Sequence, residues 1–354
     1  MPAALTLGAL SLRLLVTGGA GFIGSEFVRM TLREHAADTV TVLDKLTYAG
    51  NLHNLDAVIA DPRLRFVRGD ICDTDVVGPI ARECDIIVNF AAESHVDRSL
   101  EAPGQFIQTD VYGVYVLMEA ARASGHQRFL HVSTDEVYGA VAEGRSVETD
   151  PIDPRSPYSA SKAGGEMLIR AYRASFGFPA IVTRGANTYG WYQYPEKIIP
   201  LFITNAIDDQ PLPIYGDGSA VRDYILVEDH CRGIDIALRK GRIGDDYNIG
   251  AGGEIDGRTV ADTVLGLLGK PVTLKQPVGD RPGHDRRYAL DSSRLRALGW
   301  TPQVSFAQGM ERTVRWYVEH PEWWRPLKNG EFWAFYQRNY KPLRSGANGP
   351  GDAN

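Results

Sequence analysis

Three consecutive polar residues, Thr134, Asp135 and Glu136, stand just after the apolar-edged run RFLHV, within VSTDEVYG at 132–139. Two adjacent carboxylates repel each other, which drives their pKa values apart. Carboxyl groups held in different protonation states can serve as an acid and a base. The alternative is a solvated polar turn after a strand, in which Asp135 caps the segment that follows. Which hypothesis holds depends on the other groups that share the site.

Tyr158 and Lys162, four residues apart in SPYSASKAG, start a helix expected over 158–176. Residues i and i+4 lie above one another on one helix face. An ammonium beside a phenol favours the phenolate, so we expect the pKa of Tyr158 to fall from about 10 toward the working pH. The pair could then act as a base. The structural alternative is a surface tyrosine packed against the lysine stem.

A glycine-rich loop, TGGAGFIG, follows the first apolar run and precedes a helix expected over 23–35. Glycines let the backbone turn tightly and approach a pyrophosphate, whose charge the helix N-terminus then binds. Asp44 ends the next apolar run, 20 residues after Gly24, where its carboxylate can accept hydrogen bonds from an adenosine ribose. That carboxylate would repel a 2′-phosphate; Lys45 beside it weakens this argument, but NAD is favoured over NADP. A glycine turn without a ligand is the alternative.

Alternating strands and helices must place these groups. The apolar runs are LRLLVTG, TVTVLD, RFVRGD, IIVNFAA, RFLHVS and PAIVTRG, and helix-length stretches at 23–35, 107–124 and 158–176 lie between them. This rhythm predicts an α/β fold of the Rossmann type, with a doubly wound parallel sheet covered on both faces. Cofactors lie along the carboxyl ends of such strands, so Asp70 would either reach an adenine or serve as a turn residue.

The rhythm changes after about residue 190, where Gly, Pro and aromatic residues concentrate in loops. We expect residues 12–190 to form an NAD-binding domain and 191–340 to form mainly a smaller substrate-binding lobe. Strands near YNIG and VTLKQ are expected to return in part to the first core. We interpret residues 1–11 as an N-terminal extension and the small, polar residues 341–354 as a disordered tail.

The composition excludes several classes of function. The net charge of −6 gives no basic footprint for nucleic acid. The three cysteines show no C-x-x-C spacing, so we expect no metal site and a reducing, cytoplasmic location. No apolar run approaches the roughly 20 residues of a membrane span, so no membrane association is expected.

TGGAGFIG together with Tyr158-x-x-x-Lys162 resembles the extended short-chain dehydrogenase/reductase family, whose members act mostly on nucleotide sugars. More narrowly, stretches such as FAAESHVDRS, VSTDEVYG, YQYPEKIIPLF and GDRPGHDRRYALD are similar to the dTDP-glucose 4,6-dehydratase family, over roughly residues 12–325. In this resemblance the Thr-Asp-Glu triplet distinguishes dehydratases from sugar epimerases.

The resemblance implies NAD-dependent dehydration of a nucleotide-activated hexose, with dTDP-glucose favoured, to the 4-keto-6-deoxy sugar. It implies that Tyr158 takes the C4 hydroxyl proton, that Lys162 holds the phenolate and that Thr134 hydrogen-bonds the C4 oxygen. It assigns Glu136 as the base at C5 and Asp135 as the acid at the C6 oxygen. Hydride returns from NADH to C6, so NAD would be a tightly retained catalyst.

The resemblance also implies two sets of binding residues. The cofactor set is Gly18, Gly21, Phe22, Ile23, Gly24, Asp44, Lys45, Thr47, Asp70, Ile71, Ala91 and Ala92, with Tyr158 and Lys162. The substrate set is Ser94, His95, Asn187, Glu196, Lys197, Tyr215, Arg222, Asn248, Arg281 and His284. Arginines suit bidentate phosphate contacts, and a tyrosine offers a face to a pyrimidine ring.

The sequence departs from the family pattern in TRGANTYGWYQ and in VRDYILVEDH. The departing positions are Gly185, Ala186, Thr188, Trp191, Tyr224 and Leu226; relatives usually have proline in place of Trp191. These changes bear on the sugar, the base or the final product. A 4-epimerase, a decarboxylase or a different dehydratase, possibly acting on a UDP-sugar, is therefore the alternative function. A non-catalytic NAD-sensing protein is the third hypothesis, against which the intact Tyr158 and Lys162 argue.

Tyr112, Tyr115 and the apolar positions of helices 107–124 and 158–176 exceed what one sheet face can cover. In the family that the chain resembles, these two helices pair with their copies in a four-helix bundle. We therefore expect a homodimer.

Overall fold

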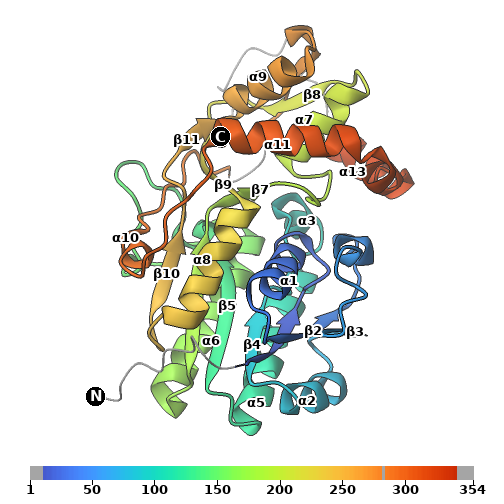
Figure 1. Cartoon of the computed structure of the whole chain (residues 1–354). Coiled ribbons are helices and arrows are strands. Elements are labelled where there is room, and N and C mark those ends of the chain that lie inside the picture. The colour runs from blue at the N-terminus through green and yellow to red at the C-terminus, as the bar shows by residue number, and fades with distance from the viewer. Residues whose placement is uncertain (1–10, 281–283, 341–354) are drawn as a thin grey trace.

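Seven parallel strands form the central sheet of the computed structural model, which describes residues 11–280 and 284–340 (Figure 1). The order is β10-β6-β5-β4-β1-β2-β3. The bounds are β1 Arg13–Thr17, β2 Thr39–Asp44, β3 Leu64–Arg68, β4 Ile86–Asn89, β5 Arg128–Thr134, β6 Ala180–Gly185 and β10 Asp246–Ile249. The six apolar runs of the sequence are thus confirmed as strands. The order reverses beside β1, and this reversal opens a crevice at the carboxyl ends of the strands.

Helices cover both faces of the sheet. One face carries α1 (Phe22–Glu34) and α8 (Val227–Lys240); the other carries α2 (Thr74–Arg82), α5 (Val114–Ala123) and α6 (Pro157–Phe176) (Figure 1). Alternate strand residues point to opposite faces. Leu14 and Val16 of β1 therefore belong to the core with α1, whereas Leu15 between them belongs to the core with α5. The predicted Rossmann-type fold is confirmed.

A capping box fixes the start of α6. Ser156 Oγ accepts from the amide of Ser159 at 3.0 Å, and Ser159 Oγ accepts from the amide of Ser156 at 3.0 Å. Pro157 occupies the first helical position, and Gly177 ends the helix with a φ of 63°. These local signals place Tyr158 in the first turn of α6, facing the carboxyl ends of the strands.

The helix expected over 107–124 is interrupted. It consists of α4 (Pro103–Ile107), a π-helical turn η2 (Gln108–Gly113) and α5. The Asp110 side chain lies in this turn and accepts from the amide of Glu93 at 2.9 Å and from Ser161 Oγ at 2.7 Å. The wider turn therefore joins the start of α6 to the loop after β4.

The residues after 190 build most of a separate lobe. It contains β7 (Asn187–Tyr189), β8 (Leu212–Tyr215), β9 (Val221–Leu226), β11 (Glu254–Asp256), β12 (Lys275–Val278), α7 (Ile198–Ile207), α9 (Gly257–Leu268), α11 (Phe306–Glu319), α12 (Pro321–Trp324) and α13 (Gly330–Asn339). Shorter elements are η1 (Leu52–Leu55), α3 (Val96–Glu101), η3 (Asp135–Tyr138), η4 (Val272–Leu274), α10 (Ser293–Arg296) and η5 (Arg325–Leu327).

One of the two late strands returns to the first core. β10 pairs in parallel with β6, at the edge of the large sheet. β12 instead pairs with β8 in the lobe, so the expectation for VTLKQ is wrong. The run KQPV has too few apolar residues for a strand that must be buried on both faces.

Several sequence predictions lie outside the described residues. These are most of the 1–11 extension, the 341–354 tail and Arg281. Over 11–280 and 284–340, no helix combines the length and the apolar character needed to cross a membrane. In the same ranges, His, Cys, Asp and Glu side chains form no cluster of three or more that could hold a metal ion.

A fully buried ion network lies behind the turn η3. The Arg184 guanidinium, at the end of β6, lies 2.6 Å from Glu166 of α6 and 2.9 Å from Asp246 of β10. It also donates to the Tyr138 hydroxyl at 2.7 Å, which in turn donates to Asn248 Oδ1 at 2.9 Å. The network therefore holds the turn that carries Asp135 and Glu136 against three core elements.

Replacing Arg184 by methionine should lower the free energy of unfolding by about 3–5 kcal/mol, because a buried carboxylate loses its partner. Urea denaturation followed by circular dichroism measures the change. The matched control is Glu311→Gln, which breaks a 2.8 Å ion pair with Arg315 on the surface of α11. The control should cost no more than about 0.5 kcal/mol. Equal losses in the two variants would contradict a structural role for the buried network.

Candidate active site

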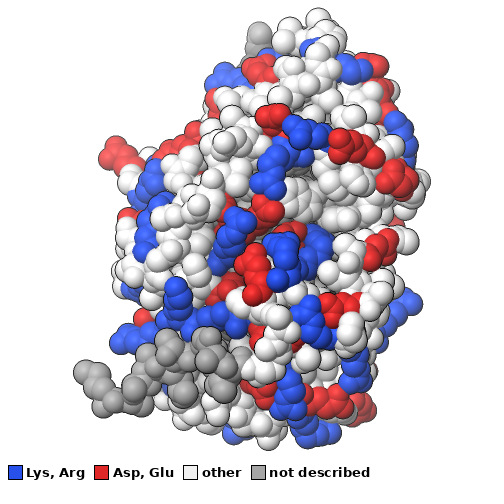
Figure 2. Space-filling model, viewed as in Figure 1, with Lys and Arg blue, Asp and Glu red and all other residues white. Residues whose placement is uncertain are grey.

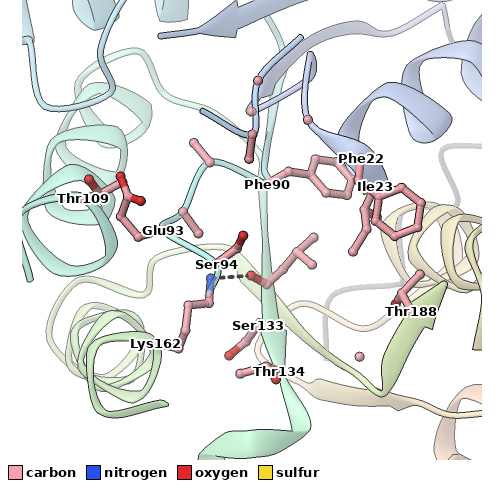
Figure 3. A pocket seen from close by; sticks show the side chains of 18 of the residues that line it. Phe22, Ile23, Phe90, Glu93, Ser94, Thr109, Ser133, Thr134, Lys162 and Thr188 are labelled. Atoms are coloured by element: carbon pink, nitrogen blue, oxygen red, sulfur yellow. Dashed lines mark hydrogen bonds between the residues drawn. The ribbon is translucent and has the colours of Figure 1, made fainter. Parts of the chain in front are cut away.

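Two adjoining cavities open at the carboxyl ends of the central strands, and Figure 3 shows the first of them. The first, of about 290 Å³, lies over β1, β4, β5 and β6; the second, of about 160 Å³, lies between the sheet and the lobe. Glu136, Asn187 and Lys197 line both cavities. A ligand that spans the two cavities would therefore pass these three side chains.

The glycine loop packs too closely for a side chain at Gly18 or Gly24. Gly18 has a φ of +68°, and a Cβ there would lie 2.6 Å from the amide nitrogen of Ala91. A Cβ on Gly24 would lie 2.3 Å from the carbonyl oxygen of Gly18. The helix α1 begins after Gly21 without a side-chain cap, so its first amides can bind an anion. Figure 3 shows Phe22 and Ile23, from the start of α1, facing this cavity.

Two backbone amides position the Asp44 carboxylate, and one of them belongs to the glycine loop. One carboxylate oxygen accepts from the amide of Ala20 at 2.9 Å and the other from the amide of Leu46 at 2.8 Å. Burial raises the pKa of Asp44, and these two amides oppose the rise. Lys45 pairs with Asp70 at 2.6 Å. The ammonium that could have compensated a 2′-phosphate is thus already paired, which strengthens the argument for NAD over NADP.

Nearly all of the cofactor residues expected from the sequence line the first cavity. They are Gly18, Gly21, Phe22, Ile23, Asp44, Lys45, Thr47, Asp70, Ile71, Ala91, Ala92, Tyr158 and Lys162. Gly24 does not line it and serves the packing of α1 on the loop. An uncapped helix N-terminus for a pyrophosphate, a closely packed glycine loop and a carboxylate for a ribose together fit a dinucleotide.

The carboxyl pair follows β5. Thr134 Oγ1 accepts from the amide of Glu136 at 3.2 Å, so Thr134, and not Asp135, caps the turn η3. Asp135 is 3% exposed, and its Oδ2 is buried without a hydrogen-bond partner. Burial, followed by the charge of Glu136, raises the pKa of Asp135 to about 8, while Arg222 opposes the rise. Asp135 is therefore protonated at neutral pH.

Tyr158 and Lys162 line the same cavity wall as the carboxyl pair. Lys162 is buried and donates to the carbonyl oxygen of Val132 at 2.9 Å (Figure 3). Burial lowers its pKa, and the carboxylates of Asp110 and Glu166 oppose that fall.

The expected fall in the pKa of Tyr158 is wrong for this structure. Burial raises the pKa well above 10, and the charges of Glu136 and Asp110 raise it further. Contact with Thr134 lowers it only in part. The i, i+4 spacing revealed the lysine but not the carboxylates that distant segments bring to the phenol.

Most of the expected substrate residues surround the second cavity. His95, Asn187, Glu196, Lys197, Tyr215, Arg222 and His284 line it, whereas Ser94 lines the first cavity. Arg222 donates to the carbonyl oxygens of Val221 and Asp285, both at 2.8 Å, and lies 4.4 Å from the ring centroid of Tyr288. Its guanidinium is thus held rigidly at the wall.

Glu196 and Asn248 play other parts in the structure. Glu196 is 2% exposed and receives two hydrogen bonds from Arg98, whose guanidinium lies 3.8 Å from the ring centroid of Tyr48. Asn248 lines neither cavity; it is fully buried, and its side-chain amide bonds Tyr138 and Ser146. Asn248 therefore supports the turn η3 from behind.

The sequence analysis missed several residues that the fold brings to the site. Glu93 and His230 line the first cavity, and burial raises the pKa of Glu93. Asp110 lies beside Lys162, and burial raises its pKa to about 6. Glu93 and Arg98 stand inside the stretch FAAESHVDRS and could have been singled out there. Asp110 gives no local signal, because only the π-helical turn directs it inward.

The positions that depart from the family pattern separate into groups. Gly185, Ala186 and Thr188 line the first cavity, Tyr224 lines the second, Leu226 lies in the lobe core, and Trp191 lines neither cavity. A Cβ on Gly185 would lie 2.4 Å from the His230 ring, and Thr188 Oγ1 lies 2.7 Å from His230 Nδ1. Two of the departures thus fit the wall around one imidazole.

Comparisons with known proteins agree with this geometry. The family described as GDP-mannose 4,6 dehydratase matches residues 15–313. A dTDP-glucose 4,6-dehydratase of Streptomyces niveus is 50% identical over 324 residues, which cover 90% of this chain and 96% of that protein.

Solved structures show the same likeness. DesIV, a dTDP-glucose 4,6-dehydratase from Streptomyces venezuelae solved with NAD bound, is 52% identical with a TM-score of 0.88, over 90% of this chain and 100% of that one. A UDP-glucose 4-epimerase from Thermus thermophilus, also in complex with NAD, is 34% identical with a TM-score of 0.81, over 87% of this chain and 99% of that one. The chain therefore belongs to the dTDP-glucose 4,6-dehydratase family, within the extended short-chain dehydrogenases/reductases.

Proposed function

We propose that this protein is an NAD-dependent dehydratase that converts dTDP-glucose to the 4-keto-6-deoxy sugar and water. The observation that carries the proposal is the buried Asp135 next to Glu136, at the wall that also holds Tyr158 and Lys162, where burial and Glu136 raise the pKa of Asp135. A reaction that needs both an acid and a base beside the oxidation site can use this arrangement. Residues 12–190 mainly hold NAD, and 191–340 mainly hold the nucleotide.

The glycine loop, the first turn of α1 and Asp44 would hold the pyrophosphate and ribose of NAD. Bound there, NAD would supply the acceptor for the C4 hydride and its donor to C6, and its oxidised form would bring a cationic ring into the cavity. A cation there would oppose the carboxylates that raise the pKa of Tyr158.

Tyr158 takes the proton of the C4 hydroxyl, and the Thr134 hydroxyl donates a hydrogen bond to the oxygen that becomes the ketone. Lys162 keeps a positive charge at the base of the phenol, because the carboxylates of Asp110 and Glu166 oppose its loss of a proton. Its bond to the carbonyl of Val132 fixes where that charge lies.

The ketone makes the C5 hydrogen acidic, and elimination then follows. Glu136 removes the C5 proton, while Asp135 gives its proton to the departing C6 oxygen, so that C5–H and C6–O break, C5=C6 forms and water leaves. Glu136 returns its proton to C5 as hydride reaches C6. Tyr158 has gained one proton and Asp135 has lost one, so exchange through solvent resets both groups.

The side chains shared by the two cavities would place the sugar. Lys197 donates to the carbonyl oxygen of Ser94 and lines both cavities, so its positive charge lies where an anionic diphosphate would pass. Asn187 also lines both, and its Oδ1 is buried without a hydrogen-bond partner. Tyr215 and Arg222 line the second cavity, where the base and phosphates would lie.

We also propose that two copies of the chain associate through α4–η2–α5 and α6. Ile107, Tyr112, Tyr115, Met167 and Phe176 on these helices are each at least 41% exposed. Large apolar side chains gathered on adjacent helices mark an interaction face. A second copy presents the same face, as a two-fold interface requires.

Glu136→Gln should separate oxidation from elimination. The wild type should convert dTDP-glucose to a ketone product, detected by its absorbance in alkali. The variant should lose that product by about 10²–10⁴-fold, because no base removes the C5 proton. It should still accumulate NADH, measured by fluorescence, because Tyr158 and Lys162 are intact. An epimerised sugar without a ketone would instead favour the epimerase alternative, and normal turnover would show that Glu136 is not the base.

The rate should fall as the pH rises through about 8, because Asp135 must be protonated to act and loses its proton there. Steady-state kcat against pH measures this alkaline limb in the wild type. Asp135→Asn has no proton to lose, so its low residual rate should not show that limb. If the same limb persisted in Asp135→Asn, another group would be the acid.

The wild type should have a solution mass twice the 39.0 kDa of one chain, measured by light scattering. Replacing both Tyr112 and Tyr115 by glutamate should give a monomer, because the two charges would be buried without partners in the interface. The control is Ile243→Glu, which changes an exposed apolar residue outside these helices and should leave the mass unchanged. A monomeric wild type would exclude the proposed dimer.

A further inference from the structure

The segment 187–197, called here the strap, joins β7 to α7 and carries much of the site. Its residues Asn187, Glu196 and Lys197 line the second cavity, and Asn187, Thr188, Gln193, Tyr194 and Lys197 line the first. Trp191, in the middle of the strap, lines neither. Its side chain therefore requires a separate explanation.

The Trp191 side chain bonds helix α1 on the back of the strap. Its indole Nε1 donates to Glu26 Oε2 at 2.9 Å, and Glu26 is 2% exposed and paired with Arg29 at 2.6 Å. The same indole packs against both the core of the first domain and the core of the lobe.

The lobe holds the other side of the indole. Arg312 of α11 lies 5.0 Å from the Trp191 ring centroid and pairs with Glu228 of α8 at 2.8 Å. Figure 2 shows basic and acidic side chains gathered where the lobe meets the face of α1 and α8. Trp191 therefore lies where α1 and α8 of the first domain meet α11 of the lobe.

The neighbouring Tyr192 makes a second connection, which reaches the glycine loop. Tyr192 has a φ of +62°, an unfavourable conformation for a bulky residue that persists only where the surroundings impose it. Arg29 lies 4.6 Å from its ring centroid and donates to the carbonyl oxygen of Asn54. Asn54 Nδ2 in turn donates to the carbonyl oxygen of Ala20 at 2.9 Å, in the glycine loop.

We propose that Trp191 is a positioning residue that fastens the strap to α1, so that Asn187 and Lys197 keep a fixed spacing from the glycine loop. This inference rests on the proposed function for the identity of the substrate. Trp191 lines neither cavity, so it acts on the substrate only through the strap. Its loss should shift Asn187 and Lys197, and with them the bound sugar diphosphate. The acid, the base and Tyr158 lie on other segments and should stay in place.

The test compares Trp191→Phe with Trp300→Phe in the full-length enzyme. Trp300 is 1% exposed and donates through Nε1 to the carbonyl of Asp229 at 3.0 Å, so both variants lose one indole hydrogen bond to a buried residue. Trp191→Phe should raise KM for dTDP-glucose by about tenfold and change kcat by less than about twofold, the pattern of lost ground-state binding. Trp300→Phe should lower Tm without changing KM.

Hydrogen exchange gives a readout that needs no turnover. Trp191→Phe should speed exchange in 187–197 and in the first turns of α1, and Trp300→Phe should not. Glu26→Gln, a milder change of the same contact, should move KM and exchange in the same direction, and the double variant should add little to either single one.

Two results would overturn the proposal. One is an unchanged KM with a lowered Tm in Trp191→Phe. The other is hydrogen exchange in Trp191→Phe that speeds up in the same segments as in Trp300→Phe and not in 187–197. If the wild type did not convert dTDP-glucose, the proposed function would fail, and the exchange comparison alone would decide on the positioning role.

Discussion

The proton on Asp135 is the feature on which the proposed chemistry depends. A carboxyl group retains a proton at neutral pH only when its charged form is strongly disfavoured, here by burial and by the adjacent charge of Glu136. The strand β5 places the pair at its carboxyl end, Thr134 caps the turn, and the Arg184 network holds that turn from behind. These supports lie in the core, so the raised pKa of Asp135 is a consequence of the fold.

The topology of the sheet explains why the oxidation and elimination groups share one wall. The strand order reverses beside β1, which opens the crevice where the glycine loop, the loop after β4 and the start of α6 meet. Asp110 joins two of these segments through Ser161 and the amide of Glu93. Burial and the charges of Glu136 and Asp110 raise the pKa of Tyr158, so in the proposed mechanism the phenol depends on a cationic ligand to become a base.

Much of this could be predicted from the sequence wherever the signal is local. The strands, the glycine loop, Asp44 and the start of α6 each follow from a few neighbouring residues, and the structure has them. Asn248 and the strand at 275–278 could not be placed, because their partners come from Tyr138 and β8, far along the chain. The direction of the Tyr158 pKa was wrong for the same reason: the burial that raises it, and the charges of Glu136 and Asp110 that add to the rise, arise only through tertiary structure. Trp191 looked like a change near the substrate, but its indole faces α1.

The ionisation of Asp135 itself tests the account most directly. Difference infrared spectra of the wild type minus Asp135→Asn, recorded across a pH series, isolate the carbonyl band of this one protonated carboxyl group. The account predicts that the band is present at pH 7, where the pH is below the pKa of Asp135, and that it disappears around pH 8. A carboxylate already ionised at neutral pH, titrating near the ordinary value of about 4, would contradict it.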